Sequence, residues 1–386
     1  MKIAYIAVKG MPLGGGIERY TEELGSRLAA RGHEVVVYAM RHYGASDGLY
    51  KGMKIRTVPA LNMRAFEKLS AAALAALAAT AGKRMDIVHF HAFGPAMFCI
   101  IPRLFGRRVV VQGHGIEWKR SRWGPAGRLF LMLSEMPSVR LPHAVCVVSE
   151  TLKNYLWDTY ERECVCIPSG AAPAGPRPPS LIRRLGLAGD DYILFAARLV
   201  REKGAHYLME AFRELKNKNG LKLKLVIAGD APHEDAYKSM LRRMAKGEPG
   251  IIFPGFVTGG LLEELYSNCY LFVLPSEVEG LSVALLEAMG YGNCCLASDI
   301  PENVEAMGGN GYTFRSRDPR DLALKLSSLA AEPLMVRRMK ERARVHVMEN
   351  HSWDAITDRF ERLYRSVISG RRLEPGIQTD KHVLEK

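Results

Sequence analysis

The sequence predicts an α/β protein made of two doubly wound domains, each a mostly parallel sheet covered by helices on both faces. Short runs rich in Val and Ile alternate with helical patterns along the chain. A segment rich in Pro and Gly, 169–180, interrupts this alternation, which then restarts. The length of 386 residues suits two domains better than one large core.

Strands in the first half are expected where short apolar runs stand between turns and helical patterns. The near-continuous Val and Ile content of these runs is typical of parallel strands buried on both faces. Tyr20, Leu24 and Leu28 recur four apart, which predicts an amphipathic helix over 18–31. Ser149 predicts the N-cap of a further helix. The expected strands are 3–8, 34–38, 86–90, 108–112 and 144–148.

The second half repeats the pattern, with strands expected at 192–196, 223–228, 271–274 and 294–297. Two such domains are expected to face each other across a cleft, where open sheets of this kind bind ligands. The predicted parts are a first domain over 1–172, a second domain over 173–352, a last helix over 353–370 that packs back on the first domain, and a disordered tail over 371–386.

No targeting segment is expected. The first apolar run is too short for a signal sequence, and the Ala-rich stretch 69–82 falls short of the roughly 20 residues that span a bilayer. That stretch is expected to form a buried or surface-lying helix. The seven cysteines stand at irregular spacings that match no zinc motif, which indicates reduced thiols in a cytoplasmic protein.

The net charge of +13 is concentrated in the first half. Residues 1–175 hold 23 Lys and Arg against 13 Asp and Glu. This asymmetry indicates an anionic partner such as a membrane surface or a lipid phosphate, with simple solubility as the alternative. A nucleic-acid partner is not expected, because the basic residues do not interleave with a recognisable reader motif.

An acidic loop follows the run 271–274. Glu279 can reach a ligand from the loop, Gly280 allows close approach to the backbone, and a helix is expected from about Leu281. The free N–H groups of Leu281 and Ser282 suit a phosphate. Glu287 stands among apolar residues, where an unpaired carboxylate is costly, so we expect it to bind sugar or ribose hydroxyls. The alternative is a helix whose acidic start complements the dipole.

A basic loop follows the run 192–196. Arg198 and Lys203 are placed where they can clamp a diphosphate, Arg as a planar fork and Lys as a point charge. Surface cations are common, so the prediction of a diphosphate site depends on this basic loop lying beside the acidic loop.

Two further loops of the first half stand at strand ends. Gly14, Gly15 and Gly16 could receive phosphates, although a tight turn is the alternative. His114 lies between two glycines and is expected to be exposed to the cleft. His89 and His91 could bind a metal ion, but the sequence offers no evident third ligand.

Together these motifs resemble the retaining glycosyltransferases of family 4, which have the GT-B fold of two Rossmann-like domains. Glu279 and Glu287 stand at the family's Glu-x7-Glu spacing, and Arg198 with Lys203 matches its basic motif. Gly14 to Gly16 match its glycine loop. The segment 113–123 is similar to a subgroup of rhamnosyltransferases for bacterial surface polysaccharides. Two departures are Ala197 in place of the usual glycine and the segment 169–172 in place of Asn-Gly-Val-Asp.

The resemblance implies a role for each matching residue. Arg198 and Lys203 would neutralise the leaving diphosphate, and Leu281 and Ser282 would donate N–H groups to it. Glu279 would hold the donor sugar and Glu287 the ribose. Phe256 and Val257 would contact the base. His114 would lie by the reaction centre. Cations would replace a metal ion, so no metal or other cofactor is expected.

The first domain is expected to bind the acceptor. A group of aromatic and basic residues precedes the apolar run 129–133, which suits a membrane interface and a polyprenyl-diphosphate-linked saccharide. A buried helix with basic flanks is the alternative. The residues of this group are Trp118, Lys119, Arg120, Arg122 and Trp123.

The sequence therefore predicts transfer of a hexose or deoxyhexose from a nucleoside-diphosphate sugar to a saccharide acceptor. A nucleotide-sugar epimerase of similar shape is the nearest rival, because it would share the donor site. An inactive scaffold of the same fold is the other alternative, and the presence of both glutamates and both cations speaks against it.

Overall fold

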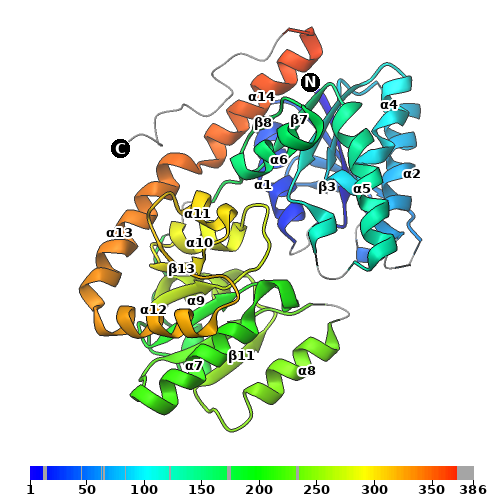
Figure 1. The fold of residues 1–386 in the computed structure, drawn as a ribbon. Helices are drawn as coiled ribbons and strands as arrows, with labels where there is room; N and C mark the ends of the chain where they lie inside the picture. The colour runs from blue at the N-terminus through cyan, green and yellow to red at the C-terminus, as the bar shows by residue number, and fades with distance from the viewer. Residues whose placement is uncertain are drawn as a thin grey trace. The chain divides into compact units, whose positions relative to one another are not determined.

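The computed structural model describes residues 1–11, 15–44, 46–61, 63, 66–82, 84–120, 123–171, 175–231 and 234–371. The chain divides into two compact units (Figure 1). Unit 1 joins Met1–Gly170 to Trp353–Lys386, and unit 2 is Ala171–Ser352. The expected disorder of the polar tail concerns residues that, from 372 on, lie outside the described part.

Unit 1 contains an eight-stranded sheet in the order β3-β4-β2-β1-β5-β6-β7-β8. Every neighbouring pair is parallel except β3 with β4. The strands are β1 (Lys2–Val8), β2 (Glu34–Met40), β3 (Gly48–Tyr50), β4 (Met53–Val58), β5 (Ile87–His91), β6 (Arg108–Gly113), β7 (Ala144–Val147) and β8 (Val165–Cys166).

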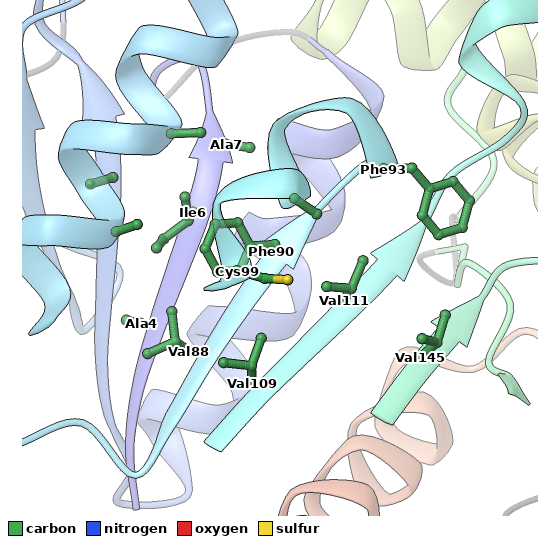
Figure 2. Close-up of a cluster of buried hydrophobic side chains, with 14 of the residues drawn as sticks. Ala4, Ile6, Ala7, Val88, Phe90, Phe93, Cys99, Val109, Val111 and Val145 are labelled. Carbon is green, nitrogen blue, oxygen red and sulfur yellow. The ribbon is translucent and has the colours of Figure 1, made fainter. Parts of the chain in front are cut away.

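Helices cover both faces of this sheet. Alternate residues of β1 enter two different hydrophobic clusters, Ile6 on one face and Ile3 on the other. Figure 2 shows the first cluster, in which Ile6, Phe90 and Val111 come from three neighbouring strands. The helices are α1 (Gly16–Ala30), α2 (Glu67–Ala81), α3 (Phe93–Ala96), α4 (Ile100–Leu104), α5 (Pro125–Arg140), α6 (Glu150–Tyr160) and α14 (Trp353–Ser369), with 3-10 turns η1 (Arg41–Tyr43), η2 (Met97–Cys99) and η3 (Glu117–Lys119).

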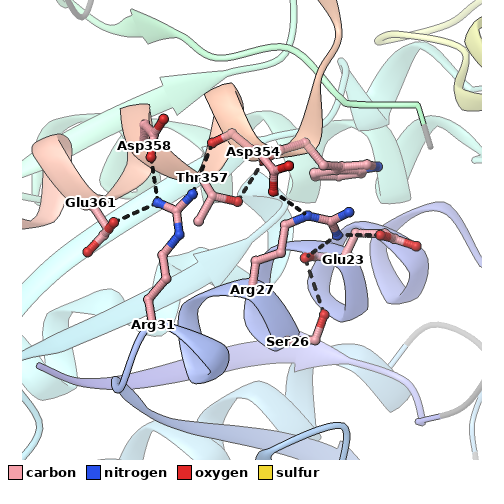
Figure 3. Close-up of polar contacts among 9 residues, drawn as sticks. Glu23, Ser26, Arg27, Arg31, Asp354, Thr357, Asp358 and Glu361 are labelled. Carbon is pink, nitrogen blue, oxygen red and sulfur yellow. Dashed lines mark hydrogen bonds and ion pairs between the residues drawn. The ribbon is translucent and has the colours of Figure 1, made fainter. Parts of the chain in front are cut away.

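The last helix, α14, belongs to the core of unit 1. Phe360 and Leu363 are fully buried in the same cluster as Leu24 of α1. Ion pairs frame this packing at the surface (Figure 3): Arg31 donates to Asp358 at 2.5 Å and to Glu361 at 2.7 Å. Helix α14 therefore combines an apolar face with a charged rim directed at α1.

Unit 2 contains a six-stranded, wholly parallel sheet in the order β11-β10-β9-β12-β13-β14. Its strands are β9 (Tyr192–Ala196), β10 (Lys224–Ala228), β11 (Ile251–Gly255), β12 (Leu271–Leu274), β13 (Cys295–Ser298) and β14 (Tyr312–Phe314). Its helices are α7 (Ala205–Asn219), α8 (Asp235–Met244), α9 (Gly259–Asn268), α10 (Val283–Gly290), α11 (Pro301–Met307), α12 (Pro319–Ala331) and α13 (Pro333–Asn350), with 3-10 turns η4 (Leu181–Leu185) and η5 (Arg201–Lys203).

The sequence predictions of two α/β domains with parallel sheets are confirmed. Tyr20, Leu24 and Leu28 form the buried face of α1. Ser149 caps α6, since its hydroxyl accepts the backbone N–H of Leu152. The Ala-rich stretch is helix α2, partly buried, and no helix within the described ranges is long and apolar enough to cross a bilayer.

We expect Phe360→Ala to lower the free energy of unfolding of unit 1 by about 3–5 kcal/mol, because truncating a buried aromatic ring leaves a cavity. Arg31→Ala should cost only about 1 kcal/mol or less, because its ion pairs lie at the surface. Urea unfolding followed by tryptophan fluorescence measures unit 1 alone, since every tryptophan of the chain belongs to it: Trp118, Trp123, Trp157 and Trp353. Equal losses in the two variants would contradict the assignment of α14 to the core.

Candidate functional site

The basic and acidic loops of the sequence meet in unit 2. Strands β9 and β12 are parallel neighbours, so the loops that follow them leave the same edge of the sheet. Lys203, after β9, donates from Nζ to Oε1 of Glu279, after β12, at 2.5 Å. The side chains are only 14% and 8% exposed, so this ion pair is shielded from water. Arg198 lies in the first loop and is exposed.

Backbone contacts hold the two loops together. The N–H of Glu277 donates to the carbonyl of Glu202 at 2.8 Å. Gly204 has φ of +71°, and a Cβ there would lie 1.9 Å from the carbonyl oxygen of Pro275. Only glycine allows both this conformation and this approach. The ion pair is therefore fixed by the backbone as well as by its own charges.

Buried serine hydroxyl groups hold Glu279 in place through hydrogen bonds. Their role was not predicted from the sequence. Ser276 donates to Oε1 of Glu279 at 2.6 Å. The hydroxyl of Ser298, at the end of β13, donates to the carbonyl of Ser276, and Asn303 donates to Ser298. The signal was a polar residue at the end of each of two buried strands, which is the place where ligand-binding groups gather in such sheets.

The other acid of the loop, Glu277, has protein partners of its own. It accepts from the hydroxyl of Tyr207 at 3.0 Å and pairs with Arg317 at 2.8 Å. These bonds explain its place in the loop as a brace and distinguish it from Glu279.

Helix α10 begins at Val283, two residues later than the sequence suggested. Ser282 is its N-cap, and its hydroxyl accepts the N–H of Leu285. Ser282 is buried and Leu281 is half-buried, after the buried Gly280. No backbone hydrogen bond from the N–H of Leu281 or Ser282 occurs within the described part of the chain. The start of α10 thus offers N–H groups and a positive dipole end beside Glu279 in the same loop.

Glu287 lies in the second turn of α10. It is half-buried and accepts from the hydroxyl of Tyr266 at 3.4 Å. Tyr266 in turn stacks on Tyr291, with ring centroids 5.4 Å apart. The partner was missed because it comes from α9, outside the motif.

Phe256 and Val257 follow β11, at the same edge of the sheet but beyond β10 and β9. Phe256 is exposed and Val257 is half-buried. An exposed aromatic ring at a ligand-binding edge can stack on a planar base.

In unit 1, His114 follows β6 and is half-buried, whereas the sequence predicted a residue exposed to the cleft. Its Nε2 lies 3.0 Å from Nδ1 of His91, and Tyr20 packs edge-on against its ring. A Cβ at Gly113 would lie 2.3 Å from the ring of Phe93, which explains one of the flanking glycines by packing. Burial lowers the pKa of His114 to about 3, so this imidazole is neutral at pH 7.

The glycine loop of unit 1 is described only in part. Gly15 is the N-cap of α1 and Gly16 its first residue, whereas Gly14 lies outside the described residues. The carboxylate of Glu18 folds back over Gly15, and it accepts the N–H of Lys9 at 3.0 Å. The buried carboxylate of Glu18 thus lies close to Gly15 and binds the backbone of Lys9 within unit 1.

The aromatic and basic group before α5 is less exposed than its sequence suggests. Trp118 packs against the core, and Trp123 is half-buried. Lys119 lies over the ring of Trp118, Arg120 is half-buried, and Arg122 lies outside the described residues. The exposed apolar surface is instead on α5 itself, which excludes the buried-helix alternative; its exposed residues are Leu129, Phe130, Met132, Leu133 and Met136.

The two histidines of β5 are buried inside unit 1. His89 is buried, and its Nδ1 lies 2.6 Å from the hydroxyl of Tyr364, while burial lowers its pKa to about 3. In the ranges that the structure describes, no group of three or more His, Cys, Asp or Glu residues is arranged to hold a metal ion.

Two family models match the chain. The model for Glycosyl transferases group 1 matches residues 180–346, and the model for Glycosyltransferase Family 4 matches residues 14–174. The two models match successive parts of the chain, one in each half, and both describe glycosyltransferases, in agreement with the GT-B fold of two Rossmann-like domains. The protein is therefore a transferase enzyme.

Curated relatives of this glycosyltransferase are about a quarter identical to it over the aligned segments. An uncharacterized glycosyltransferase of Methanocaldococcus jannaschii is 27% identical over 186 residues, which span 47% of each chain. The chain thus spans about half the length of that relative. The alpha-maltose-1-phosphate synthase of Mycobacterium tuberculosis is 26% identical over 320 residues, 75% of this chain and 81% of the relative.

Solved structures show the same fold at lower identity. The sucrose-phosphate synthase of Thermosynechococcus elongatus superposes with a TM-score of 0.83 at 21% identity, over 96% of this chain and all of that one. The Anabaena protein HepE, solved in complex with UDP-glucose, superposes with a TM-score of 0.78 at 18% identity, over 95% of this chain and all of that one.

We expect Gly204→Ala to lower the stability of unit 2 by about 2–5 kcal/mol, because it adds a clash with Pro275 to the cost of the left-handed backbone. Gly220→Ala is the matched control: it has φ of +60° and open space around it, so it should cost about 1–2 kcal/mol. Unit 2 has no tryptophan, so its unfolding is followed by far-UV circular dichroism, with tryptophan fluorescence reporting unit 1. A cost at Gly204 no larger than at Gly220 would show that the two loops are not held together as described.

Proposed function

We propose that this enzyme transfers a hexose or deoxyhexose, with retention of configuration, from a nucleoside-diphosphate sugar to a lipid-linked saccharide. The observation that carries the proposal is the meeting of Lys203, Glu279 and the start of α10 around one loop. A cation and free N–H groups suit a diphosphate, and a carboxylate suits sugar hydroxyls. The UDP-glucose bound to HepE supports a donor of this class.

The ion pair suggests how the donor enters. Glu279 neutralises the shielded charge of Lys203. A bound diphosphate would replace the carboxylate as the partner of Lys203. Glu279 would then be free to accept hydrogen bonds from the sugar, with Ser276 keeping it in place. Glu287 would hold the ribose and Phe256 the base.

The chemistry asked of these residues is electrostatic. Negative charge develops on the leaving diphosphate, and Lys203, the exposed Arg198 and the start of α10 would stabilise it without a metal ion. The leaving phosphate would itself accept the proton of the acceptor hydroxyl on the same face of the sugar. We assign to His114, neutral and half-buried, a hydrogen bond with a sugar hydroxyl.

The acceptor is proposed to reach unit 1 from a membrane surface. Helix α5 exposes a row of apolar side chains, with Leu129 59% and Leu133 65% exposed, and carries the exposed Arg128 and Arg140. Apolar residues flanked by arginine suit the interface of an anionic bilayer. A polyprenyl-diphosphate-linked saccharide would be presented there, to an enzyme at the inner face of the plasma membrane.

We expect one nucleoside diphosphate among UDP, GDP and dTDP to raise the melting temperature of unit 2, with CMP as a monophosphate comparison. Lys203→Ala should abolish most of that shift and lower turnover about 100-fold or more, because a preorganised charge is lost. Lys218→Ala, an exposed lysine that pairs only with Glu214 in the described chain, is the control and should behave as the wild type. EDTA should change neither quantity.

Three results would argue against the proposed function. A failure of every nucleotide to shift the melting temperature would remove the donor site. Full turnover by Lys203→Ala would remove the phosphate role of that lysine. Isomerised nucleotide sugar, formed without an acceptor, would identify an epimerase instead.

We expect Leu133→Glu to weaken binding to vesicles that contain anionic lipid by about tenfold or more, because a charge replaces an apolar contact. Leu324→Glu, at a residue 69% exposed in unit 2, is the matched control and should not change binding. Vesicle co-sedimentation at low and high salt measures both. If wild-type protein stays in the supernatant at low salt, the membrane part of the proposal is wrong.

A further inference from the structure

Three polar side chains form a chain inside unit 1 that the proposed function does not yet use. Thr21 Oγ1, on α1, lies 3.1 Å from Nε2 of His91 at the end of β5. The Nδ1 of His91 lies 3.0 Å from Nε2 of His114, just after β6. Thr21 and His91 are fully buried and His114 is half-buried, so the chain runs from the interior toward the surface.

The position of each proton follows from the deep end of this chain. The Thr21 hydroxyl has one hydrogen, and it donates that hydrogen to the carbonyl of Ile17 at 2.8 Å, as threonine commonly does within a helix. Its oxygen is therefore left to accept from His91, whose hydrogen must be on Nε2.

The direction of the hydrogen bond between the His91 and His114 rings follows from the hydrogen on His91. Burial and the neighbouring rings of His89 and His114 hold the pKa of His91 well below its usual value, so His91 carries one ring hydrogen at pH 7. With that hydrogen on Nε2, Nδ1 of His91 is an acceptor. His114 must then donate from its own Nε2.

His114 stands at the outer end of this row of hydrogen-bonded side chains. Burial, with Lys68 and Arg120 nearby, lowers the pKa of His114 to about 3, so it too carries one hydrogen. That hydrogen is on Nε2, which leaves a lone pair on Nδ1. In the part of the chain that the structure describes, Nδ1 of His114 makes no hydrogen bond. The row of hydrogen-bonded side chains from Thr21 to His114 therefore ends in a nitrogen that can accept a hydrogen bond from a hydroxyl group.

The rings are also held by packing. Tyr5 stacks on His91 at 5.4 Å, and Tyr20 lies edge-on to both histidines. Directly after His91, Ala92 has φ of +70° and ψ of 144°, a sparsely populated conformation that costs an alanine about 1–3 kcal/mol. Strained backbone of this kind persists where the surroundings over-determine it and often lies beside functional groups.

We propose that His91 is a positioning residue that, anchored by Thr21, keeps the hydrogen of His114 on Nε2, so that Nδ1 of His114 accepts a hydrogen bond from a substrate sugar hydroxyl. This inference rests on the proposed function for the identity of the hydroxyl. The arrangement of the three side chains does not depend on it. The logic is that of a functional imidazole oriented by a third group.

Thr21→Val tests the proposal at the residue farthest from His114. Valine has nearly the shape of threonine but cannot accept from His91, so His91 becomes free to move its hydrogen to Nδ1 and to reverse the bond with His114. Thr21→Ser keeps the hydroxyl and is the matched control. His91→Phe removes the link itself and serves as a second variant.

Two readouts separate positioning from folding. In ¹⁵N-histidine NMR spectra of the full chain, nitrogens that carry a hydrogen are distinguished from those that do not. We expect His114 with hydrogen on Nε2 in the wild type and in Thr21→Ser, and a change toward Nδ1 in Thr21→Val. Turnover should fall about tenfold to a hundredfold in Thr21→Val, the usual range for orienting partners. Nucleoside-diphosphate binding to unit 2 should be unchanged.

Hydrogen on Nδ1 of His114 in the wild type would overturn the proposal. So would Thr21→Val and His91→Phe variants that keep both the wild-type ring spectrum and the wild-type turnover. A wild-type protein that turns over no nucleotide sugar would instead sink the proposed function, while the ring hydrogens would still decide whether His91 sets the tautomer of His114.

Discussion

The parallel pairing of β9 with β12 is the constraint on which the proposed donor site depends. Parallel strands end at one edge of a sheet, so two loops that are far apart in sequence leave the sheet as neighbours. The backbone bond from Glu277 to Glu202, and the approach that Gly204 allows, then fix one loop against the other. Without this alignment, the cation and the carboxylate would be isolated surface charges.

Burial gives that ion pair its chemical meaning. A lysine that is largely shielded from water loses much hydration, and a carboxylate at 2.5 Å offsets the loss only while nothing better charged competes. A diphosphate is a stronger partner for a cation than one carboxylate. Under the proposed function, an anionic ligand therefore takes the place of the carboxylate as the partner of Lys203.

Much of the fold was predictable because buried parallel strands are nearly continuous in Val and Ile. The strand β4, next to the edge strand β3, was not predicted, although Met53 and Ile55 alternate with polar residues in a pattern typical of a half-buried strand. The short strand β14 has too few residues for a pattern to stand out. Prediction from periodicity thus weakens where strands shorten or reach the edge of a sheet.

The site shows the same division. Lys203, Glu279 and Ser282 were found because each stands in a local motif after an apolar run. The partners that hold them were not, since Ser298, Asn303 and Tyr266 enter from other elements whose positions only the fold supplies. A sequence pattern identifies groups that meet a ligand, whereas the bonds that aim those groups depend on tertiary packing.

Unit 1 and unit 2 solve the problem of holding a polar group in different ways. Unit 2 uses the charged pair of Lys203 and Glu279, in which, under the proposed function, a ligand takes the place of the carboxylate. In unit 1 the groups from Thr21 to His114 are neutral, and each has just enough donors for its neighbour. A neutral chain of this kind cannot be separated by an anion, but its direction can be reversed by moving two hydrogens. Its Thr21 end therefore matters as much as the ring that faces outward, because the threonine sets the direction for both histidines.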